Sequence, residues 1–290
     1  MLPSTKLLSG HQMPLVGLGT FKITGYENVF KTIEAALVAG YRSFDTASVY
    51  RNEIDIGRAL KELLPKFHLQ RQDIFITSKL GPAEQGKSKA SKALQASLQR
   101  LDCGYLDLYL IHWPGAHKLK LDDRMHKKLR AESWAEMENA FRQGEVKTLG
   151  VSNYIPSHLE ELLSTCSVKP SVLQVEYHPH LIQTDIKSIC DSHHIHLQAY
   201  SSLGTSNPDN VLIKDPKVME ISQLIHKSPA QVLLRWAVQQ NIGVLPKSTN
   251  PEHIAENIDV FSFSLSEEHM AILSQLDHKK HYCWDPAQVR

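Results

Sequence analysis

Eight short apolar segments rich in β-branched residues recur along the chain, separated by longer segments of helical periodicity. The eight are Leu15–Leu18, Ser43–Asp45, Ile74–Ser78, Leu106–Ile111, Thr148–Val151, Val172–Val175, His196–Tyr200 and Ile242–Leu245. Between them, apolar residues recur every three or four positions, as in Val29, Ile33, Ala36 and Leu37. Short strands that alternate with helices of ten or more residues indicate βαβ units and a parallel sheet. Eight such units without a composition break predict an α/β fold of the closed (β/α)8 TIM barrel type, formed by residues 1–290 as one domain.

Proline and glycine residues stand where the helices of such units should begin and end. Pro156 and Pro229 follow capping-type residues and suit a first helical turn. Gly40 lies where a helix should end, because glycine tolerates the left-handed conformation of a helix C-terminus. Ahead of the first strand, residues Leu7–Met13 predict a short N-terminal β-hairpin with Gly10 in its turn. We expect this hairpin to close the bottom of the barrel.

Charge and composition exclude several classes of protein. The formal charge is +1, from 32 basic and 31 acidic residues, so we expect no nucleic-acid partner. No apolar segment approaches the roughly 18–20 residues that span a bilayer, and the first residues lack the apolar run of a signal peptide. The four cysteines show neither a CxxC pair nor zinc spacing. We therefore expect a cytoplasmic protein with free thiols, no metal and no membrane association, and nothing indicates more than a monomer.

Polar side chains end seven of the eight apolar segments. In chain order these ends carry Asp45, Lys79, His112, Ser152–Asn153, Gln174 with Glu176, Tyr200–Ser201 and Lys247–Ser248. One such residue alone is more often a helix cap or a satisfied core residue. The strand ends of a barrel, however, converge on one mouth, where barrel enzymes carry their sites. Seven polar ends together therefore indicate a functional site.

The first three of these residues, with Tyr50 five positions after Asp45, suit the protonation of a carbonyl oxygen. Tyrosine is a poor acid at neutral pH, since its ordinary pKa is about 10. The ammonium of Lys79 would favour the phenolate, and Asp45 would hold the lysine charged and in place. A neutral His112 can donate a hydrogen bond to a carbonyl oxygen. Taken alone, Tyr50 could equally be an interfacial aromatic residue, but the four together predict acid-assisted hydride addition to C=O.

Hydride transfer requires a cofactor, and the sequence lacks the usual dinucleotide fingerprint. After Gly17 and Gly19 the next glycine is Gly25, so GxGxxG is absent and a Rossmann dehydrogenase is disfavoured. The segment Lys247–Glu252 (KSTNPE) places a cation, two hydroxyls and an asparagine before a proline-initiated helix, whose N-terminus favours anions. It predicts a phosphate site, with an ordinary polar loop as the alternative.

Longer motifs resemble the aldo-keto reductase superfamily over essentially the whole chain. They are MPLVGLGTF (13–21), GYRSFDTASVYRNE (40–53), LDLYLIHWP (106–114), GVSNY (150–154), QVEYHP (174–179), YSSLG (200–204) and LPKSTNPEHIAEN (245–257). Their length and order make chance similarity untenable. The resemblance implies NADPH-dependent reduction of aldehydes and ketones, with Tyr50 as the acid, Lys79 and Asp45 as its partners, and His112 orienting the carbonyl.

The resemblance also assigns binding residues. Those implied for the carboxamide and the nicotinamide ring are Ser152, Asn153, Gln174 and Tyr200. Those implied for the pyrophosphate, the 2′-phosphate and the adenine are Ser201, Leu203, Lys247, Ser248, Thr249, Asn250, His253, Glu256 and Asn257, and Thr20 is expected at the cofactor as well. The substrate pocket would contain Phe21, Trp113 and His112, with Trp284 or Tyr282 beside them.

The chain departs from the common pattern of the family at several positions. His253 stands where an arginine usually holds the phosphate of the adenine ribose, Ser202 replaces a frequent proline, and Phe21 replaces a frequent tryptophan. The loop Gly204–Lys214 and the tail after Leu276 are short. In this the chain resembles compact members, such as prostaglandin F synthases and diketogluconate reductases.

Two other interpretations compete with a carbonyl reductase. Some barrels of this family serve as cofactor-binding regulatory or structural proteins, which a missing member of the Tyr–Lys–Asp–His set would favour, and none is missing. A glycosidase needs two strand-end carboxylates about 5–10 Å apart, for which only Asp45 and Glu176 qualify. The aromatic pocket suits aromatic or medium-chain aldehydes, while the particular substrate is beyond the sequence.

Overall fold

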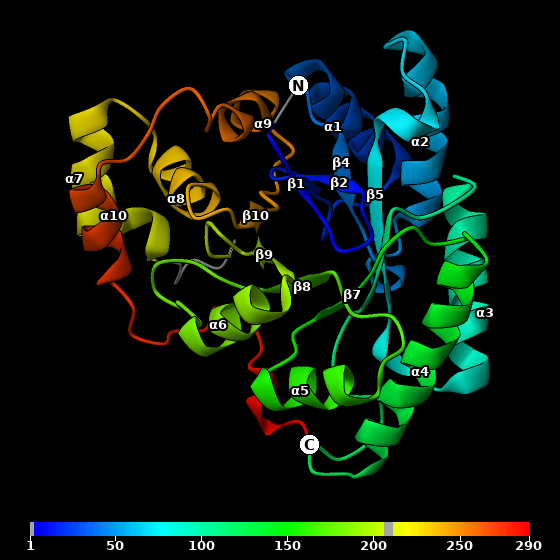
Figure 1. Cartoon of the computed structure of the whole chain (residues 1–290). Coiled ribbons are helices and arrows are strands. Elements are labelled where there is room, and N and C mark those ends of the chain that lie inside the picture. Colours follow the sequence, from blue (N-terminus) through cyan, green and yellow to red (C-terminus); the bar gives the residue numbers. More distant parts are fainter. Residues whose placement is uncertain (1–2, 206–210) are drawn as a thin grey trace.

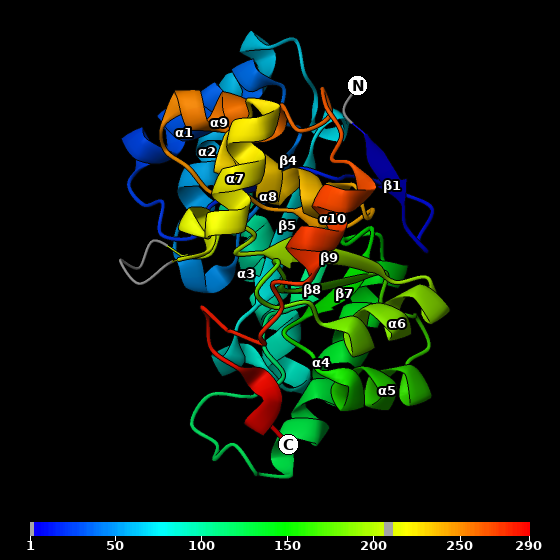
Figure 2. The same ribbon diagram turned by 90° about the vertical axis from the view of Figure 1, so that its left-hand side faces the viewer.

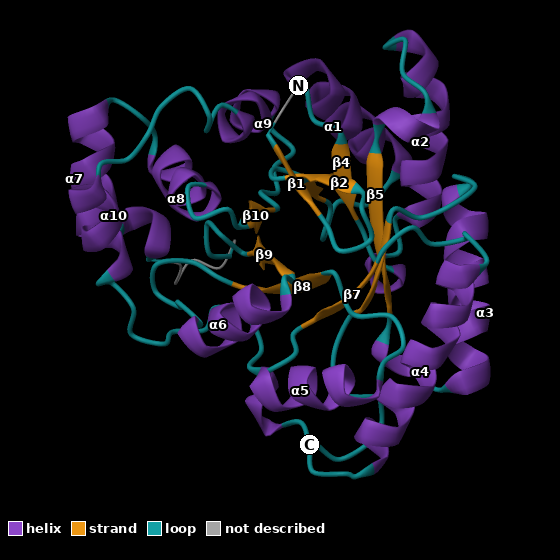
Figure 3. Ribbon diagram, viewed as in Figure 1, coloured by secondary structure: helices purple, strands orange, loops and turns teal. Residues whose placement is uncertain are grey.

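The computed structural model describes residues 3–205 and 211–290, and helices surround its main sheet (Figures 1 and 3). The sheet contains β3 (Leu18–Gly19), β4 (Ser43–Asp45), β5 (Phe75–Leu80), β6 (Leu108–Ile111), β7 (Leu149–Ser152), β8 (Val172–Glu176), β9 (His196–Tyr200) and β10 (Gly243–Val244). All neighbouring strands are parallel and follow chain order. Hydrogen bonds from Val244 N to Leu15 O (2.8 Å) and from Gly17 N to Val244 O (3.0 Å) join its two edges. The predicted (β/α)8 barrel is confirmed.

The strands at this closure are shorter than the sequence predicts. The structure begins β3 only at Leu18, and Val16 forms an isolated bridge with Val244. The neighbouring Gly17 faces the barrel interior, where a Cβ atom would lie 2.9 Å from both Leu245 Cδ2 and Ser43 Oγ. Glycine allows this close approach but weakens the regular ladder, which explains the shortening.

A two-stranded antiparallel hairpin precedes the barrel, as predicted. It consists of β1 (Ser4–Lys6) and β2 (Gln12–Pro14), and Gly10 in its turn has φ +86°. Leu7 and Met13 pack in one buried cluster with residues at the first positions of β5, β6 and β8. The hairpin therefore covers the N-terminal end of the barrel.

Helices form the outer layer of the fold. They are α1 (Tyr26–Ala39), α2 (Glu53–Lys66), α3 (Lys87–Leu101), α4 (Met125–Arg142), α5 (Pro156–Thr165), α6 (Thr184–His193), α7 (Pro216–Ile225), α8 (Pro229–Val238), α9 (Pro251–Ile258) and α10 (Glu267–Ser274). Pro156 and Pro229 begin helices, and Gly40 ends one with φ +99°, as predicted. Helix α9 lies beside α1, and the C-terminal segment reaches α4 and α5 (Figure 2).

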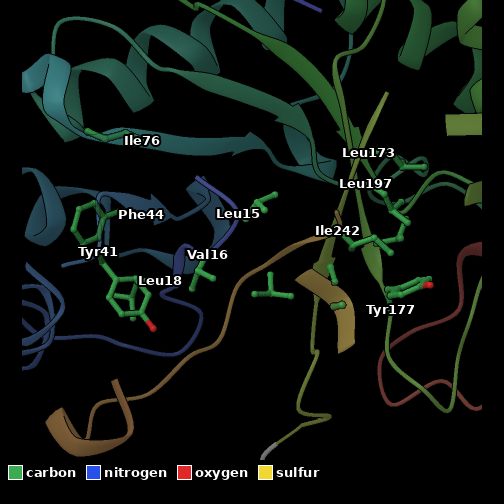
Figure 4. Close-up of a cluster of buried hydrophobic side chains, with 14 of the residues drawn as sticks. Leu15, Val16, Leu18, Tyr41, Phe44, Ile76, Leu173, Tyr177, Leu197 and Ile242 are labelled. Carbon is green, nitrogen blue, oxygen red and sulfur yellow. The ribbon is translucent and has the colours of Figure 1, made fainter. Parts of the chain in front are cut away.

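Along each strand, side chains point alternately outward, toward the helices, and inward, toward the centre of the barrel. Outward side chains such as Phe44, Ile76, Leu173 and Leu197 are buried in the core between the sheet and the helices (Figure 4). Phe75, Leu108 and Val172, at the first positions of their strands, pack against the hairpin, whereas buried polar side chains such as Asp45, Lys79, Gln174 and Gln198 lie farther along the strands toward their C-terminal ends. This gradient concentrates polar groups at the mouth of the barrel.

Candidate active site

Three side chains form a hydrogen-bonded chain at this mouth. Asp45 ends β4, Lys79 lies near the end of β5, and Tyr50 belongs to the short 3-10 helix Ser48–Tyr50 that follows β4. Lys79 Nζ lies 2.5 Å from Asp45 Oδ1 and 3.4 Å from the Tyr50 hydroxyl. It also donates to the carbonyl oxygen of Thr46 at 2.9 Å. The structure thus brings the predicted Tyr–Lys–Asp set together.

Burial and charge act in opposite directions on these groups. Burial alone would lower the pKa of Lys79, but Asp45 and Tyr50 outweigh it and raise that pKa, so the lysine is charged. Burial raises the pKa of Tyr50 above its ordinary value, and the charge of Lys79 opposes this rise. At neutral pH the tyrosine therefore keeps its proton, and a cation stands beside the oxygen that would bear the charge after the proton leaves.

His112 lies next to Tyr50, with ring centroids 5.6 Å apart. Burial, and then the charge of Lys79, hold the pKa of His112 well below its ordinary value, so the imidazole is neutral. Its buried Nδ1 atom has no hydrogen-bond partner among the described residues. A hydrogen on Nδ1 would be left unsatisfied, which favours the tautomer that carries it on Nε2. A neutral His112 that donates a hydrogen bond is the form predicted from the sequence.

A second group of polar side chains lies across the cavity. Both hydrogens of the Gln174 amide are engaged, by Asp45 Oδ2 and by Gln198 Oε1, each at 2.9 Å. Asn153 Nδ2 donates to Ser152 Oγ at 3.0 Å, and the Tyr200 hydroxyl donates to Asn153 Oδ1 at 2.6 Å. Gln174 can therefore offer an acceptor to the cavity and Ser152 a donor, the complement of a carboxamide group.

The cavity that these residues surround has a volume of about 660 Å³. Predicted residues that line it are Thr20, Phe21, Asp45, Tyr50, His112, Trp113, Ser152, Asn153, Gln174, Tyr200, Ser201, Leu203 and Lys247. Lys79 lies behind this surface and is fully buried. Trp284 does not line the cavity but packs on Trp113 at 4.7 Å between ring centroids, and Tyr282 bonds to His180 instead.

The predicted phosphate segment continues from one end of the cavity to the surface. Asn250 caps helix α9 by accepting from Glu252 N at 2.8 Å, and Ser248 Oγ accepts from Asn250 N at 3.1 Å. Thr249 and His253 are exposed, Glu256 is half-buried and Asn257 is buried. Apart from Lys247, the residues between positions 247 and 257 that were predicted at the phosphate do not line the cavity. They lie in the loop before α9 or within α9, whose N-terminus favours a phosphate.

Several lining or supporting residues were not predicted from the sequence. Asn52 donates to Thr20 O at 3.0 Å and so fixes the loop after β3, while Cys283 reaches the cavity from the C-terminal segment. Gln198 could have been found, because it lies two positions before Tyr200 and so faces the same side of β9. Asn52 lies within the motif GYRSFDTASVYRNE (40–53) but no role was predicted for it, and nothing local in the sequence marks Cys283. In the loop after Tyr200, residues 206–210 lie outside the described part of the chain.

Neither Asp45 nor Glu176 offers the free carboxylate that a glycosidase needs. Lys79 and Gln174 occupy the two oxygens of Asp45, and four donors surround Glu176.

Within residues 3–205 and 211–290, no cluster of His, Cys, Asp and Glu could hold a metal ion. Over the same residues, no helix is both long enough and apolar enough to cross a membrane.

A closed parallel barrel with a Tyr–Lys–Asp–His group at its mouth is the arrangement of a carbonyl oxidoreductase. The family model described as the aldo/keto reductase family matches residues 15–278, and the chain belongs to this family. "Glyoxal reductase" of Bacillus subtilis is 38% identical over 274 residues, which cover 94% of this chain and 92% of that protein. "Aldo-keto reductase family 1 member A1" of Cricetulus griseus is 41% identical over 292 residues, covering 95% and 89%.

Solved structures agree with this assignment. The aldose reductase of Schistosoma japonicum superposes with a TM-score of 0.86 at 36% identity, covering 97% of this chain and 94% of that one. An aldo/keto reductase of Brucella melitensis gives a TM-score of 0.85 at 35% identity, covering 96% and 100%. Nicotinamide cofactors and carbonyl substrates are general to this family.

Proposed function

We propose that this protein reduces aldehydes and ketones to alcohols with NADPH, and that Tyr50 donates the proton. The observation that carries the proposal is the buried Asp45–Lys79–Tyr50 chain, which ends at a cavity beside a neutral His112. A bound reduced nicotinamide supplies the hydride. The protein's own residues then have to orient the carbonyl and stabilise the charge on its oxygen.

The carbonyl oxygen would lie between the Tyr50 hydroxyl and Nε2 of His112. His112 aligns the oxygen by a hydrogen bond, and Tyr50 transfers its proton as negative charge develops there. Lys79 stabilises the phenolate that remains, and Asp45 keeps Lys79 oriented at 2.5 Å. Because Lys79 is fully buried, bulk water does not screen its charge.

The cavity and helix α9 fit NADPH as the cofactor. Ser152 and Gln174 complement a carboxamide, the Tyr200 ring lines the cavity beside them, and Lys247 marks the end that leads to α9. The exposed cation and hydroxyls before α9 suit the 2′-phosphate that distinguishes NADPH from NADH. We assign Ser201, Leu203, Thr20 and the residues of the phosphate segment to the same cofactor.

The substrate is proposed to be an aldehyde or a dicarbonyl. Apolar and aromatic side chains, Phe21, Val49 and Trp113, line the cavity around Tyr50, and the name of the Bacillus subtilis relative points to glyoxal. We also propose that residues 1–290 act as one catalytic domain, monomeric and cytoplasmic, which gel filtration and cell fractionation would test.

The decisive experiment measures NADPH oxidation at 340 nm with a panel of carbonyls. Tyr50→Phe keeps the ring and removes only the proton donor, so turnover should fall by about 10²–10⁴-fold while NADPH binding is retained. Activity within a few-fold of the parent would remove Tyr50 from this role. NADPH binding without turnover of any carbonyl would instead favour a regulatory or structural cofactor-binding protein.

A further inference from the structure

A buried carboxylate at the end of β8 takes no part in the proposed chemistry. Glu176 is 2% exposed, yet four donors surround its side chain. Oε1 accepts from Tyr282 N at 2.7 Å and pairs with His178 Nε2 at 3.1 Å. Oε2 accepts from Cys283 N and pairs with His281 Nδ1, each at 3.2 Å. Three of the four donors belong to the C-terminal segment, more than a hundred residues away in the sequence.

This arrangement requires a carboxylate and not merely a polar side chain. Each oxygen of Glu176 faces one backbone N–H group of the C-terminal segment, Tyr282 on one side and Cys283 on the other. A glutamine would have to turn its NH2 group toward one of these backbone donors, whichever way the amide is placed. A buried donor left facing another donor costs the full desolvation of that group.

The segment that Glu176 holds continues directly into the wall of the active-site cavity. Cys283 lines the cavity and its sulfur lies 3.3 Å from Ser201 Oγ, and the next residue, Trp284, packs on Trp113. The far end of the segment is held separately, at α4 and α5, where Arg130 bonds to the main-chain oxygen of Arg290 at 2.8 Å. Near the cavity the segment is also held by His180, whose backbone oxygen accepts from Lys280 N at 3.0 Å and whose ring lies 2.9 Å from the Tyr282 hydroxyl. Glu176 adds the contacts to the backbone of Tyr282 and of Cys283 itself.

We propose that Glu176 is a positioning residue that determines substrate selectivity, because it anchors the C-terminal segment so that Cys283 lines the pocket and Trp284 supports the ring of Trp113 in the pocket wall. The inference rests on the proposed function. Small carbonyls need only Tyr50 and His112, whereas a bulky aromatic aldehyde must also pack against Trp113, whose ring Trp284 supports. Loss of the anchor should therefore weaken bulky substrates selectively.

The test compares Glu176→Gln with Glu138→Gln in the full chain. Glu138, on the outer helix α4, is a control for the loss of a buried carboxylate alone. It is also buried, but it accepts Ser167 N at 2.6 Å and Val168 N at 2.8 Å through one oxygen, Oε1, which the oxygen of a glutamine can replace. Hydrogen exchange of residues 279–285 reports on the anchor without any substrate. Steady-state kinetics with glyoxal and with 2-naphthaldehyde report on selectivity.

In Glu176→Gln the amides of Tyr282 and Cys283 should exchange at least about tenfold faster, and KM for 2-naphthaldehyde should rise roughly tenfold. The kcat/KM for glyoxal should stay within about threefold of the parent, and Glu138→Gln should change neither exchange nor selectivity. His281→Ala, which removes one donor and leaves the carboxylate, should shift both readouts less in the same direction, and it replaces Glu176→Gln if that variant does not fold.

Unchanged exchange in the C-terminal segment would show that Glu176 is not the anchor. Faster exchange with the same preference between the two aldehydes, or an equal change in Glu138→Gln, would also overturn the proposal. If the parent reduces neither aldehyde, the proposed function fails and the selectivity role falls with it, while the exchange data still decide whether Glu176 holds the segment.

Discussion

Replacing Lys79 by methionine removes the charge that the proposed site depends on while nearly preserving the volume of the side chain. Lys79 is fully buried and its ammonium lies 2.5 Å from Asp45, which is itself 4% exposed. In Lys79→Met the carboxylate of Asp45 remains buried, and the Gln174 amide, at 2.9 Å, is the one side-chain donor left to it among the described residues.

The expected loss of stability follows from this geometry. Breaking a buried ion pair by removing one partner costs about 3–5 kcal/mol, because an uncompensated charge stays behind. For a chain of this length that corresponds to a fall in Tm of about 5–10 °C. The double variant Lys79→Met/Asp45→Asn leaves a buried amide in place of a buried charge, and should recover about 2 kcal/mol of the loss.

Catalysis should not recover in the double variant. Without the ammonium, the phenolate of Tyr50 is no longer stabilised, so kcat/KM should fall by about 10²–10⁴-fold in both variants. Asp45→Asn alone should lose less activity, since the Lys79 side chain stays beside Tyr50 and still donates to the carbonyl oxygen of Thr46. Calorimetry and NADPH oxidation on the three variants give the two readouts. A fully active Lys79→Met, or activity that returns with stability in the double variant, would refute the coupled Asp–Lys–Tyr site.

Three further predictions concern the cofactor, acid stability and helix packing. His253→Arg, at the third position of α9, should tighten NADPH binding by about 1–2 kcal/mol, or roughly 5–30-fold in Kd, because an arginine can bind a phosphate with two hydrogen bonds. The Kd for NADH, measured in the same fluorescence titration, should be unchanged. Equal tightening of both cofactors would contradict the placement of His253 at the phosphate. Burial lowers the pKa of His158 and of His196 to about 4, so below about pH 6.5 the unfolded chain binds more protons than the folded chain. The free energy of unfolding should therefore fall as the pH falls from about 6.5 toward 4, by about 2 kcal/mol per histidine at pH 5. Urea unfolding at pH 7 and 5 checks this: His196→Gln should lose about half of the pH dependence, and a flat profile in the parent would contradict it. Gly57→Ala should lower Tm, although alanine favours a helix over glycine by about 1 kcal/mol. The reason is that the new Cβ atom would lie 2.3 Å from the backbone oxygen of Leu101. A rise in Tm would show that α2 and α3 can separate freely.

The sequence by itself predicted the barrel because its periodicities are local. A strand that buries both faces needs a short apolar run, and a covering helix needs an apolar stripe, so Ile76 and Leu173 or Val29 and Ile33 mark their elements without tertiary information. Parallel strands align their C-terminal ends, so the sequence also predicted that Asp45, Lys79 and His112 share one mouth.

Tertiary structure alone decided the features that depend on contacts between distant segments. The length of β3 is set by what the backbone near Gly17 meets across the closure, and Gly57 inside α2 makes sense only where α3 passes close by. The neutral state of His112 follows from burial and from Lys79, which no local pattern reports.

The same limit applies to the walls of the pocket. Glu176 was visible as a strand-end carboxylate, but its partners Tyr282 and Cys283 come from the end of the chain. Periodicity records which face of an element is buried, and it carries no information on which remote segment covers that face. The chemistry at the mouth could therefore be predicted from strand ends, whereas the segment that completes the pocket had to be seen in the folded chain.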